Sequence, residues 1–160
     1  MTTLSDPPRT GIDPRGPRFN AAVTSVVLAV VLLTAPGAFG TALLGVQVLL
    51  FAAGAVLGVQ RTPLAWVFRT AVRPRLAPPD ELEDPAPPRF AQAVGLAFAV
   101  LALTAFLTGL EVLGLVATGF ALVAALLNAV FGLCLGCEMY LLFRRARPGV
   151  PVRHHQLSTN

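Results

Sequence analysis

Four long apolar segments dominate the chain, and short polar stretches separate them. They cover residues 19–35, 39–59, 90–110 and 112–143, with lengths of 17, 21, 21 and 32 residues. An α-helix rises about 1.5 Å per residue, so about 20 residues cross the hydrocarbon core of a bilayer. The pattern predicts an all-α membrane protein with four transmembrane helices. The fourth segment is about ten residues too long, so it should tilt, bend near Gly132 and Gly136, or project into the cytoplasm.

Composition supports the same class. Charged residues make up 12% of the chain, against about 25% in soluble domains. Glu138 is the only charged residue inside the four segments, and all 14 prolines lie outside them. These features exclude a soluble enzyme, a nucleic-acid-binding domain and a disordered chain. The net charge of +4 therefore indicates a membrane surface as the partner.

The positive charges predict the orientation. All 12 are arginines; they precede the first segment, separate the second from the third, and follow the fourth, while the two other connections have none. By the positive-inside rule, both termini and the long middle loop are cytoplasmic. The predicted order is a cytoplasmic tail (1–18), a transmembrane hairpin (19–59), a cytoplasmic loop (60–89), a second transmembrane hairpin (90–143) and a cytoplasmic tail (144–160). A cleaved signal peptide is the alternative for the first segment, but the run is longer than usual.

The residues that lead into the first and third segments form an internal repeat. Residues 13–23 read DPRGPRFNAAV and residues 84–94 read DPAPPRFAQAV, so seven of 11 positions are identical at an offset of 71. A weaker match, at an offset of 74, relates residues 54–60 to residues 128–134. The chain is therefore predicted to consist of two parallel helical-hairpin repeats. In each copy an arginine and a phenylalanine should anchor the helix at the membrane surface: Arg18, Phe19, Arg89 and Phe90.

The middle loop has a basic half and an acidic half. Pro63 is predicted to open a short helix, because proline is favoured at the first helical position. This helix would lie on the inner leaflet, with Arg69 and Arg73 opposite an apolar stripe of Leu64, Val67, Phe68, Ala71 and Val72. Residues 78–85 are acidic and rich in proline. They form either a solvated linker or a docking surface for a basic partner.

The residues best suited to chemistry lie near the end of the fourth segment. Cys134 and Cys137 are the only cysteines. On a continuous helix they lie with Glu138 within about 100° of one face. A permanent structural disulfide is disfavoured beside a reducing cytoplasm, whereas a reversible dithiol is compatible with it. Glu138 would tune the pair, either as a base for a thiol proton or as an anion that opposes the thiolate.

Glu138 also needs a partner, because a lone carboxylate close to lipid is costly. Arg61, near the end of the second segment, is the expected partner. The repeat alignment places Gln60 opposite Cys134. Gln60 and Arg61 should therefore surround the cysteines in a vestibule that faces the cytoplasm.

Two other interpretations of the cysteine pair stay open. Cysteine packs as a small apolar residue, and Gly-x-x-x-Gly spacings favour close helix contacts. The residues expected to pack helices are Gly54, Gly58, Asn128, Gly132 and Gly136, with Asn128 turned away from the cysteine face. A metal site would need Glu138 and the tail residues His154 and His155, but no known spacing joins them. We therefore assign no metal ligand and no cofactor.

Three stretches carry a resemblance to a known family: I-D-P-R-G-P-R-F-N, the loop sequence V-R-P-R-L-A-P-P with E-L-E-D-P-A-P-P-R-F-A-Q, and N-A-V-F-G-L-C-L-G-C-E-M-Y. From about Ile12 to Arg145 the chain resembles the bacterial membrane family catalogued as domain of unknown function 4395. The resemblance implies a multi-pass protein of the bacterial cytoplasmic membrane. Members are often encoded near thioredoxin-like and rhodanese-like sulfurtransferase proteins, so the resemblance favours thiol or sulfur chemistry without supplying an activity.

The leading hypothesis is a thiol-redox or sulfur-handling membrane protein that acts through Cys134 and Cys137, with Glu138 beside them. The expected partners are the lipid bilayer and a cytoplasmic thioredoxin-like or rhodanese-like protein, not nucleic acid. A homo-oligomer is compatible with the sequence. The alternatives are a non-enzymatic membrane scaffold, in which the cysteines pack helices, and a metal-binding membrane protein.

Overall fold

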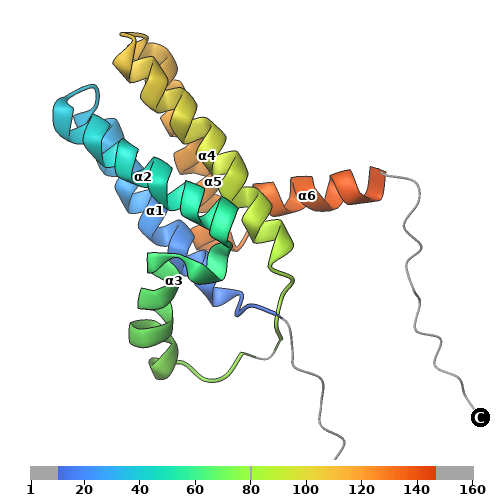
Figure 1. The fold of residues 1–160 in the computed structure, drawn as a ribbon. Helices are drawn as coiled ribbons and strands as arrows, with labels where there is room; N and C mark the ends of the chain where they lie inside the picture. Colours follow the sequence, from blue (N-terminus) through green and yellow to red (C-terminus); the bar gives the residue numbers. More distant parts are fainter. Residues whose placement is uncertain (1–10, 80, 147–160) are drawn as a thin grey trace, which may run out of the picture.

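The computed structural model describes residues 11–79 and 81–146. All regular structure in this part of the chain is helical, apart from one isolated β-bridge. Figure 1 shows four long helices, α1 (Arg15–Thr34), α2 (Ala38–Leu57), α4 (Ala86–Leu107) and α5 (Glu111–Phe131). Each is long and apolar enough to cross a membrane. The prediction of an all-α chain with four membrane spans is confirmed.

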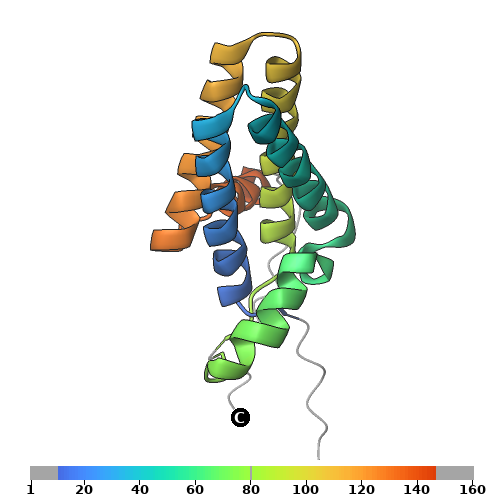
Figure 2. The same ribbon diagram turned by 90° about the vertical axis from the view of Figure 1, so that its left-hand side faces the viewer.

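The long helices form two antiparallel hairpins, α1–α2 and α4–α5, that pack side by side (Figure 2). The most extensive contacts between the hairpins join α1 to α5 and α2 to α4, so the four helices close into a bundle. Both hairpin turns lie at one end of the bundle, named here the turn end. The starts of α1 and α4 lie at the other, with α3 (Pro63–Val67). This is named the loop end.

In its core the bundle buries four alanines together with a few large side chains, and it leaves many large apolar residues outside. Leu33, Phe39, Val112 and Phe120 are each more than 60% exposed on the outer surface. In lipid, small residues let helices approach closely, while large apolar residues face the acyl chains. The distribution is that of a multi-pass membrane protein. The buried core consists of Leu28, Val31, Leu44, Phe51, Ala99, Ala102, Phe106, Ala117 and Ala121.

The segment after α2 is helical at the predicted place. α3 begins at Pro63, and Thr62 caps it by accepting the N–H of Ala65 at 3.1 Å. The helical path continues through a π turn (Phe68–Val72) and a 3-10 turn (Arg73–Arg75). Phe68 is buried, and its ring centroid lies 5.8 Å from that of Phe19. This contact fixes the segment on the start of α1.

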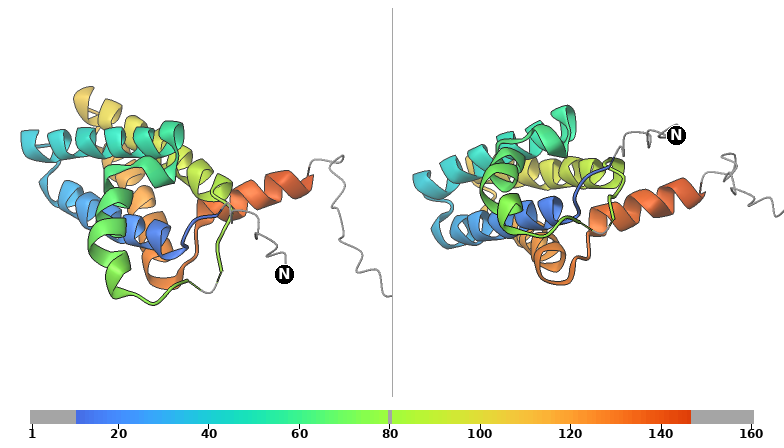
Figure 3. Two further views of the ribbon diagram at one scale, coloured as in Figure 1. Left: turned by 60° about the horizontal axis from the view of Figure 1, so that its bottom comes forward. Right: turned by 90° about the horizontal axis from the view of Figure 1, so that it is seen from below.

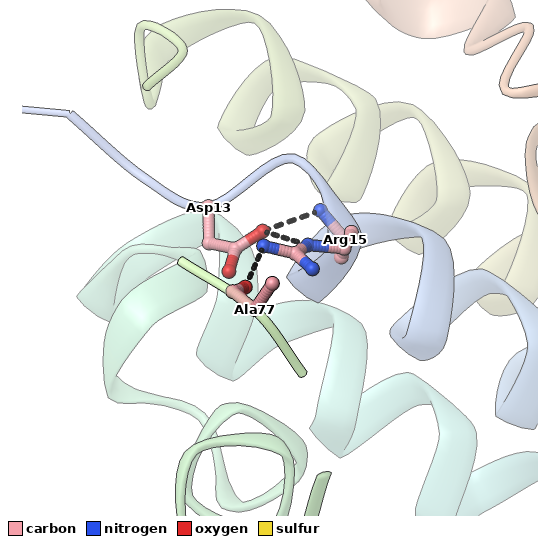
Figure 4. Close-up of polar contacts among 3 residues, drawn as sticks. All are labelled: Asp13, Arg15 and Ala77. Carbon is pink, nitrogen blue, oxygen red and sulfur yellow. Dashed lines mark hydrogen bonds and ion pairs between the residues drawn. The ribbon is translucent and has the colours of Figure 1, made fainter. Parts of the chain in front are cut away.

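The residues before α1 are fastened to the residues before α4. Ile12 and Glu83 form an antiparallel bridge with two N–H···O bonds of 2.9 Å. Arg15 donates from Nη2 to the carbonyl of Ala77 at 2.8 Å (Figure 4). Oδ1 of Asp13 accepts the backbone N–H of Arg15 at 3.0 Å and its Nε at 3.1 Å. The two hairpins are thus tied together at the loop end.

The fourth predicted span, residues 112–143, is two helices rather than one. α5 ends at Phe131, and α6 (Leu135–Ala146) begins after a short break. Figure 3 shows α6 leaving the bundle sideways instead of continuing α5. Of the three alternatives expected for this long segment, the structure has the bend near Gly132. The surplus residues form a separate helix.

Candidate functional site

α5 ends in a turn that favours glycine. Gly132 has a φ of 71°, which is left-handed and strained for other residues. Its N–H donates to the carbonyl of Asn128 at 3.0 Å, and the N–H of Leu133 donates to the carbonyl of Leu127 at 3.2 Å. The first of these bonds, with Gly132 in the left-handed conformation, is the αL capping motif, which terminates a helix. The chain therefore turns although its apolar character continues.

The break places the cysteine pair at the N-terminus of α6. Cys134 precedes the helix, and its carbonyl accepts the N–H of Glu138 at 3.0 Å, so Cys134 is the N-cap residue. Cys137 is the third residue of the helix. The two Cα atoms lie 5.1 Å apart, and the side chains are joined as a disulfide. The pair expected inside a continuous helix instead begins a new one.

α6 is held on α4 by a close contact at Gly136. A Cβ built on Gly136 would lie 2.6 Å from Cα of Ala91, closer than real Cβ atoms approach. The ring of Phe90 adds contacts with Tyr140 and Phe143, at centroid distances of 5.8 and 6.4 Å. The start of α4 therefore positions the turn that carries the cysteines. Phe90, expected as a membrane anchor, is part of this support.

α6 has one polar and one apolar side. At 100° per residue, one side holds Cys137, Glu138, Arg144 and Arg145, with Leu141 as the one apolar residue among them. Glu138 is exposed, and both cysteines are partly buried. The cysteine pair thus lies where an apolar surface meets a polar one. The apolar side of the helix consists of Leu135, Met139, Leu142 and Phe143.

The structure does not bring Gln60 and Arg61 to the cysteines. Arg61 is exposed in the turn after α2, and Glu138 forms no ion pair with the other residues described. Glu138 belongs to α6, which is not one of the four helices long and apolar enough to cross a membrane, so the reason to expect a partner for a membrane-embedded carboxylate no longer applies. Gln60 lines a cavity of about 340 Å³ at the loop end, together with Arg69. This loop cavity does not include the cysteines.

A second cavity, of about 290 Å³, adjoins the cysteine pair inside the bundle. Cys134 and Gly136 line this bundle cavity with residues of α1, α2, α4 and α5. Asn128 lines it too, although a continuous helix would turn Asn128 away from the cysteine face. The break at Gly132 redirects the chain and brings Asn128 and Cys134 to the same space. Sequence periodicity gives no signal for this proximity.

The four glycines expected at helix contacts fall into two groups. A Cβ on Gly54 would lie 2.8 Å from the side chain of Gln92, so α2 and α4 approach closely there. Gly136 likewise allows a close approach, between α6 and α4. Gly58 has a φ of 92° with no atom within 4 Å of a built Cβ, and it ends α2 as Gly132 ends α5.

The two entry arginines bind carbonyl groups at helix ends, contacts that the sequence analysis missed. Arg89 donates from Nε to Ala55 at 2.7 Å and from Nη2 to Val56 at 2.9 Å. Arg18 donates from Nη2 to Val130 at 3.3 Å. Each arginine covers last-turn carbonyls of a helix in the other hairpin, groups without a partner in their own helix. Arg18 and Arg89 are related by the repeat offset of 71, and Val56 and Val130 by the offset of 74. These two offsets could have predicted the contacts from the sequence.

The described residues offer little support for a metal site. No group of three or more His, Cys, Asp or Glu side chains that could hold a metal ion occurs within residues 11–79 and 81–146. His154 and His155 lie outside the described residues.

Comparison with known families gives a match over most of the chain. A family model described as a domain of unknown function (DUF4395) matches residues 12–145. No curated protein and no solved structure gives a significant match.

Proposed function

The chain belongs to the DUF4395 family, and we propose that it is a thiol-redox or sulfur-handling protein of the bacterial cytoplasmic membrane. Cys134 and Cys137 alternate between a dithiol and a disulfide. The observation that carries this proposal is that both cysteines lie in the first turn of α6, with Cα atoms 5.1 Å apart.

A helix N-terminus supports thiol chemistry for a physical reason. The first N–H groups of a helix have no carbonyl partner within it, and the helix dipole adds partial positive charge there. Both effects favour the thiolate, which is the reactive form of cysteine. Gly136 between the cysteines lets the turn rest on α4.

The proposed reaction is thiol–disulfide exchange with a partner dithiol. A partner thiolate attacks the sulfur of Cys137, forms a mixed disulfide and releases Cys134 as a thiolate. The second partner thiol then displaces Cys137, so the partner leaves as a disulfide and both protons pass to the cysteine pair. Cys137 is the attacked sulfur because it lies on the polar side of α6, whereas Cys134 borders the bundle cavity.

Glu138 has a tuning role in this proposal. Its carboxylate is exposed on α6, one residue after Cys137. A rhodanese-like partner would use the same pair differently: the outer sulfur of its persulfide passes to a cysteine thiolate, and the partner thiolate is released.

The partner approaches from the cytoplasm. The loop end carries Arg15, Arg18, Arg89 and the arginines of residues 60–75, and the positive-inside rule assigns such an end to the cytoplasm. A reducing compartment on this side keeps the pair in exchange rather than permanently oxidised. The partner docks on residues 60–89 and on the polar side of α6.

Duplication of a hairpin accounts for the framework of the site. The bridge pairs Ile12 with Glu83, which are themselves 71 residues apart. Asp13 and Asp84 each accept the N–H two residues further along the chain. The two entry arginines each cover the helix end of the other hairpin. These reciprocal contacts support two parallel repeats related by a pseudo-twofold axis.

The proposal is tested by differential alkylation in native membranes, with and without reductant. We expect two thiols to become reactive after reduction. We also expect Cys134→Ser to form a mixed disulfide with a thioredoxin-like or rhodanese-like protein through Cys137. Cys137→Ser is the matched control, because its remaining thiol borders the cavity and should trap less partner.

Thiols that never change state would contradict the redox proposal and favour the scaffold. The double variant Cys134→Ser/Cys137→Ser further distinguishes a redox protein from a scaffold. If the protein is a scaffold, this variant should be less stable than the wild type. If the cysteines are a redox pair, the variant should keep the helical circular dichroism of the wild type and lose only thiol–disulfide exchange.

A further inference from the structure

The bundle cavity connects the cysteine pair with the apolar interior of the bundle. Its volume of about 290 Å³ is close to the lower end of the range of ~300–1,000 Å³ for small-molecule sites. Cys134 stands at one edge. The aromatic part of the wall consists of Phe51, Phe98 and Phe120. A flat ring of moderate size fits such a space, and a peptide does not.

The cavity reaches the lipid-facing surface between α4 and α5. Phe98 and Phe120 belong to its wall and are also 36% and 63% exposed, with ring centroids 6.5 Å apart. Exposed aromatic residues on membrane-crossing helices contact acyl chains. A molecule dissolved in the bilayer can therefore enter beside these rings.

Three carboxamide side chains interrupt the apolar wall. They are Asn20 of α1, Gln92 of α4 and Asn128 of α5. Within the described residues, the carboxamide that forms a side-chain hydrogen bond is that of Gln47, and these three form none. Their N–H groups are suited to carbonyl oxygens of a ligand. A purely hydrocarbon occupant would leave them without partners, which is costly in an apolar site.

We propose that the bundle cavity binds the ring of a membrane quinone, which oxidises the Cys134–Cys137 dithiol. The inference rests on the proposed redox function and names its electron acceptor. The ring packs against the phenylalanines, its carbonyl oxygens accept from the carboxamides, and its apolar tail extends into lipid beside Phe98 and Phe120.

The reaction balances without a further oxidant. The two thiols lose two electrons and two protons and form one S–S bond. The quinone gains the same electrons and protons and becomes a hydroquinone, which returns to the bilayer. Cys134 is the sulfur next to the ring, and Cys137 on the polar side of α6 faces the thiol partner. Electrons thus pass from cytoplasmic thiols to the quinone pool.

The test uses the full-length protein, reduced and reconstituted without air into lipid nanodiscs free of quinone. Decylubiquinone is the probe, because its fully substituted ring resists direct addition of thiols. We expect one quinone to be reduced for each disulfide formed, followed by quinone absorbance and by thiol alkylation. In the Cys134→Ser/Cys137→Ser variant, which cannot be oxidised, the probe should still raise the thermal unfolding midpoint.

Two variants of adjacent residues on α5 locate the site. Ala124 lines the cavity, so Ala124→Phe fills it and should slow quinone-dependent oxidation by about tenfold or more. Val123 is 54% exposed and lies outside the cavity wall, so Val123→Phe is the matched control and should keep the rate. Asn128→Leu removes one carboxamide and should weaken quinone binding, even if Ala124→Phe fails to fold.

The outcomes separate this inference from the proposed function. If oxidised glutathione oxidises the cysteine pair and decylubiquinone does not, the quinone inference is wrong and the redox function stands. If neither reagent changes the thiols, the redox function itself is wrong. Equal oxidation rates in the Ala124→Phe and Val123→Phe variants would assign the reaction to chemistry outside the cavity and overturn the inference.

Discussion

Arg89 donates from Nη2 to the carbonyl of Val56 across 2.9 Å, so the start of α4 covers the end of α2. Its Nε donates to the carbonyl of Ala55 at 2.7 Å. Carbonyls in the last turn of a helix have no partner inside it, and close to lipid an unpaired carbonyl is costly. The positive charge also lies at the negative end of the dipole of α2. This arginine therefore joins the two hairpins.

Replacing Arg89 should weaken the bundle. We expect Arg89→Ala to lower the free energy of unfolding by about 1 kcal/mol, which is below the ~1.5–3 kcal/mol of charged hydrogen bonds because the side chain is exposed. Arg89→Lys should keep only part of this stability, because an ammonium group cannot bind two carbonyls at once as a guanidinium group does. Denaturant unfolding in detergent micelles, followed by circular dichroism, measures both. Arg61→Ala removes a side chain that forms no hydrogen bond with the described residues, and an equal loss there would indicate a general effect of charge.

The contact between Gly136 and Ala91 should control the docking of α6. Gly136→Leu places a side chain where even a Cβ would lie 2.6 Å from Cα of Ala91, so α6 must move away from α4. Arg144 is exposed already, but cleavage by trypsin requires the helix to open locally, and a detached α6 should open more readily. We therefore expect cleavage after Arg144 to become severalfold faster. Gly119→Leu is the control, since no atom lies within 4 Å of a Cβ at that position of α5. Similar cleavage rates in the two variants would show that this contact does not hold α6.

Gln47 offers a change that should not destabilise the bundle. It is 1% exposed in the middle of α2; its Nε2 is 3.5 Å from Oγ1 of Thr24, and its Oε1 has no partner. Gln47→Leu removes an unsatisfied buried carbonyl, so we expect the free energy of unfolding to rise by about 1 kcal/mol. Leu44→Ala, one turn earlier and equally buried, should lose about 2–5 kcal/mol in the same assay. A loss of stability in Gln47→Leu would mean that the carboxamide makes a valuable polar contact.

Hydropathy predicted the four spans because a chain in lipid must satisfy its backbone polar groups internally, which leaves few possible structures. The predicted second span, residues 39–59, differs from α2 (Ala38–Leu57) by one or two residues at each end. The starts were less well predicted: α1 begins at Arg15 and α4 at Ala86, ahead of the apolar residues. Hydropathy marks where a helix enters the hydrocarbon, whereas the helix itself starts in the polar layer. Proline is tolerated in a first turn, so Pro17, Pro87 and Pro88 did not delay it.

The site could not be predicted because it depends on one backbone turn. A glycine within an apolar run is used both for helix contacts and for helix ends, and the sequence around Gly132 does not distinguish them. The assumption of a continuous helix put Glu138 in the membrane and so required Arg61 as a partner. It also turned Asn128 away from Cys134. Once α5 ends at Phe131, Glu138 is exposed and Asn128 shares a cavity with Cys134.

Alanine at Gly132 tests whether this turn prepares the cysteines for chemistry. The φ of 71° costs about 1–2 kcal/mol for a residue with a Cβ, although a Cβ there would make only ordinary van der Waals contacts with Arg18. We expect Gly132→Ala to lower stability by about that amount and to favour a helix that runs past Cys134. Cys134 would then no longer cap a helix, so its thiolate would lose the free N–H groups and the positive end of the dipole. The reduced variant should therefore react severalfold more slowly with iodoacetamide at neutral pH.

Gly119→Ala is the matched control, because it adds the same methyl group to the interior of α5 with no atom within 4 Å. It should raise stability by up to about 1 kcal/mol, as alanine is the better helix former, and leave thiol reactivity unchanged. The two substitutions are thus expected to change stability in opposite directions. If both variants alkylate at the wild-type rate while Gly132→Ala is destabilised, the turn shapes the fold without activating the cysteines. The reactivity of the pair would then have to come from its surroundings on α6.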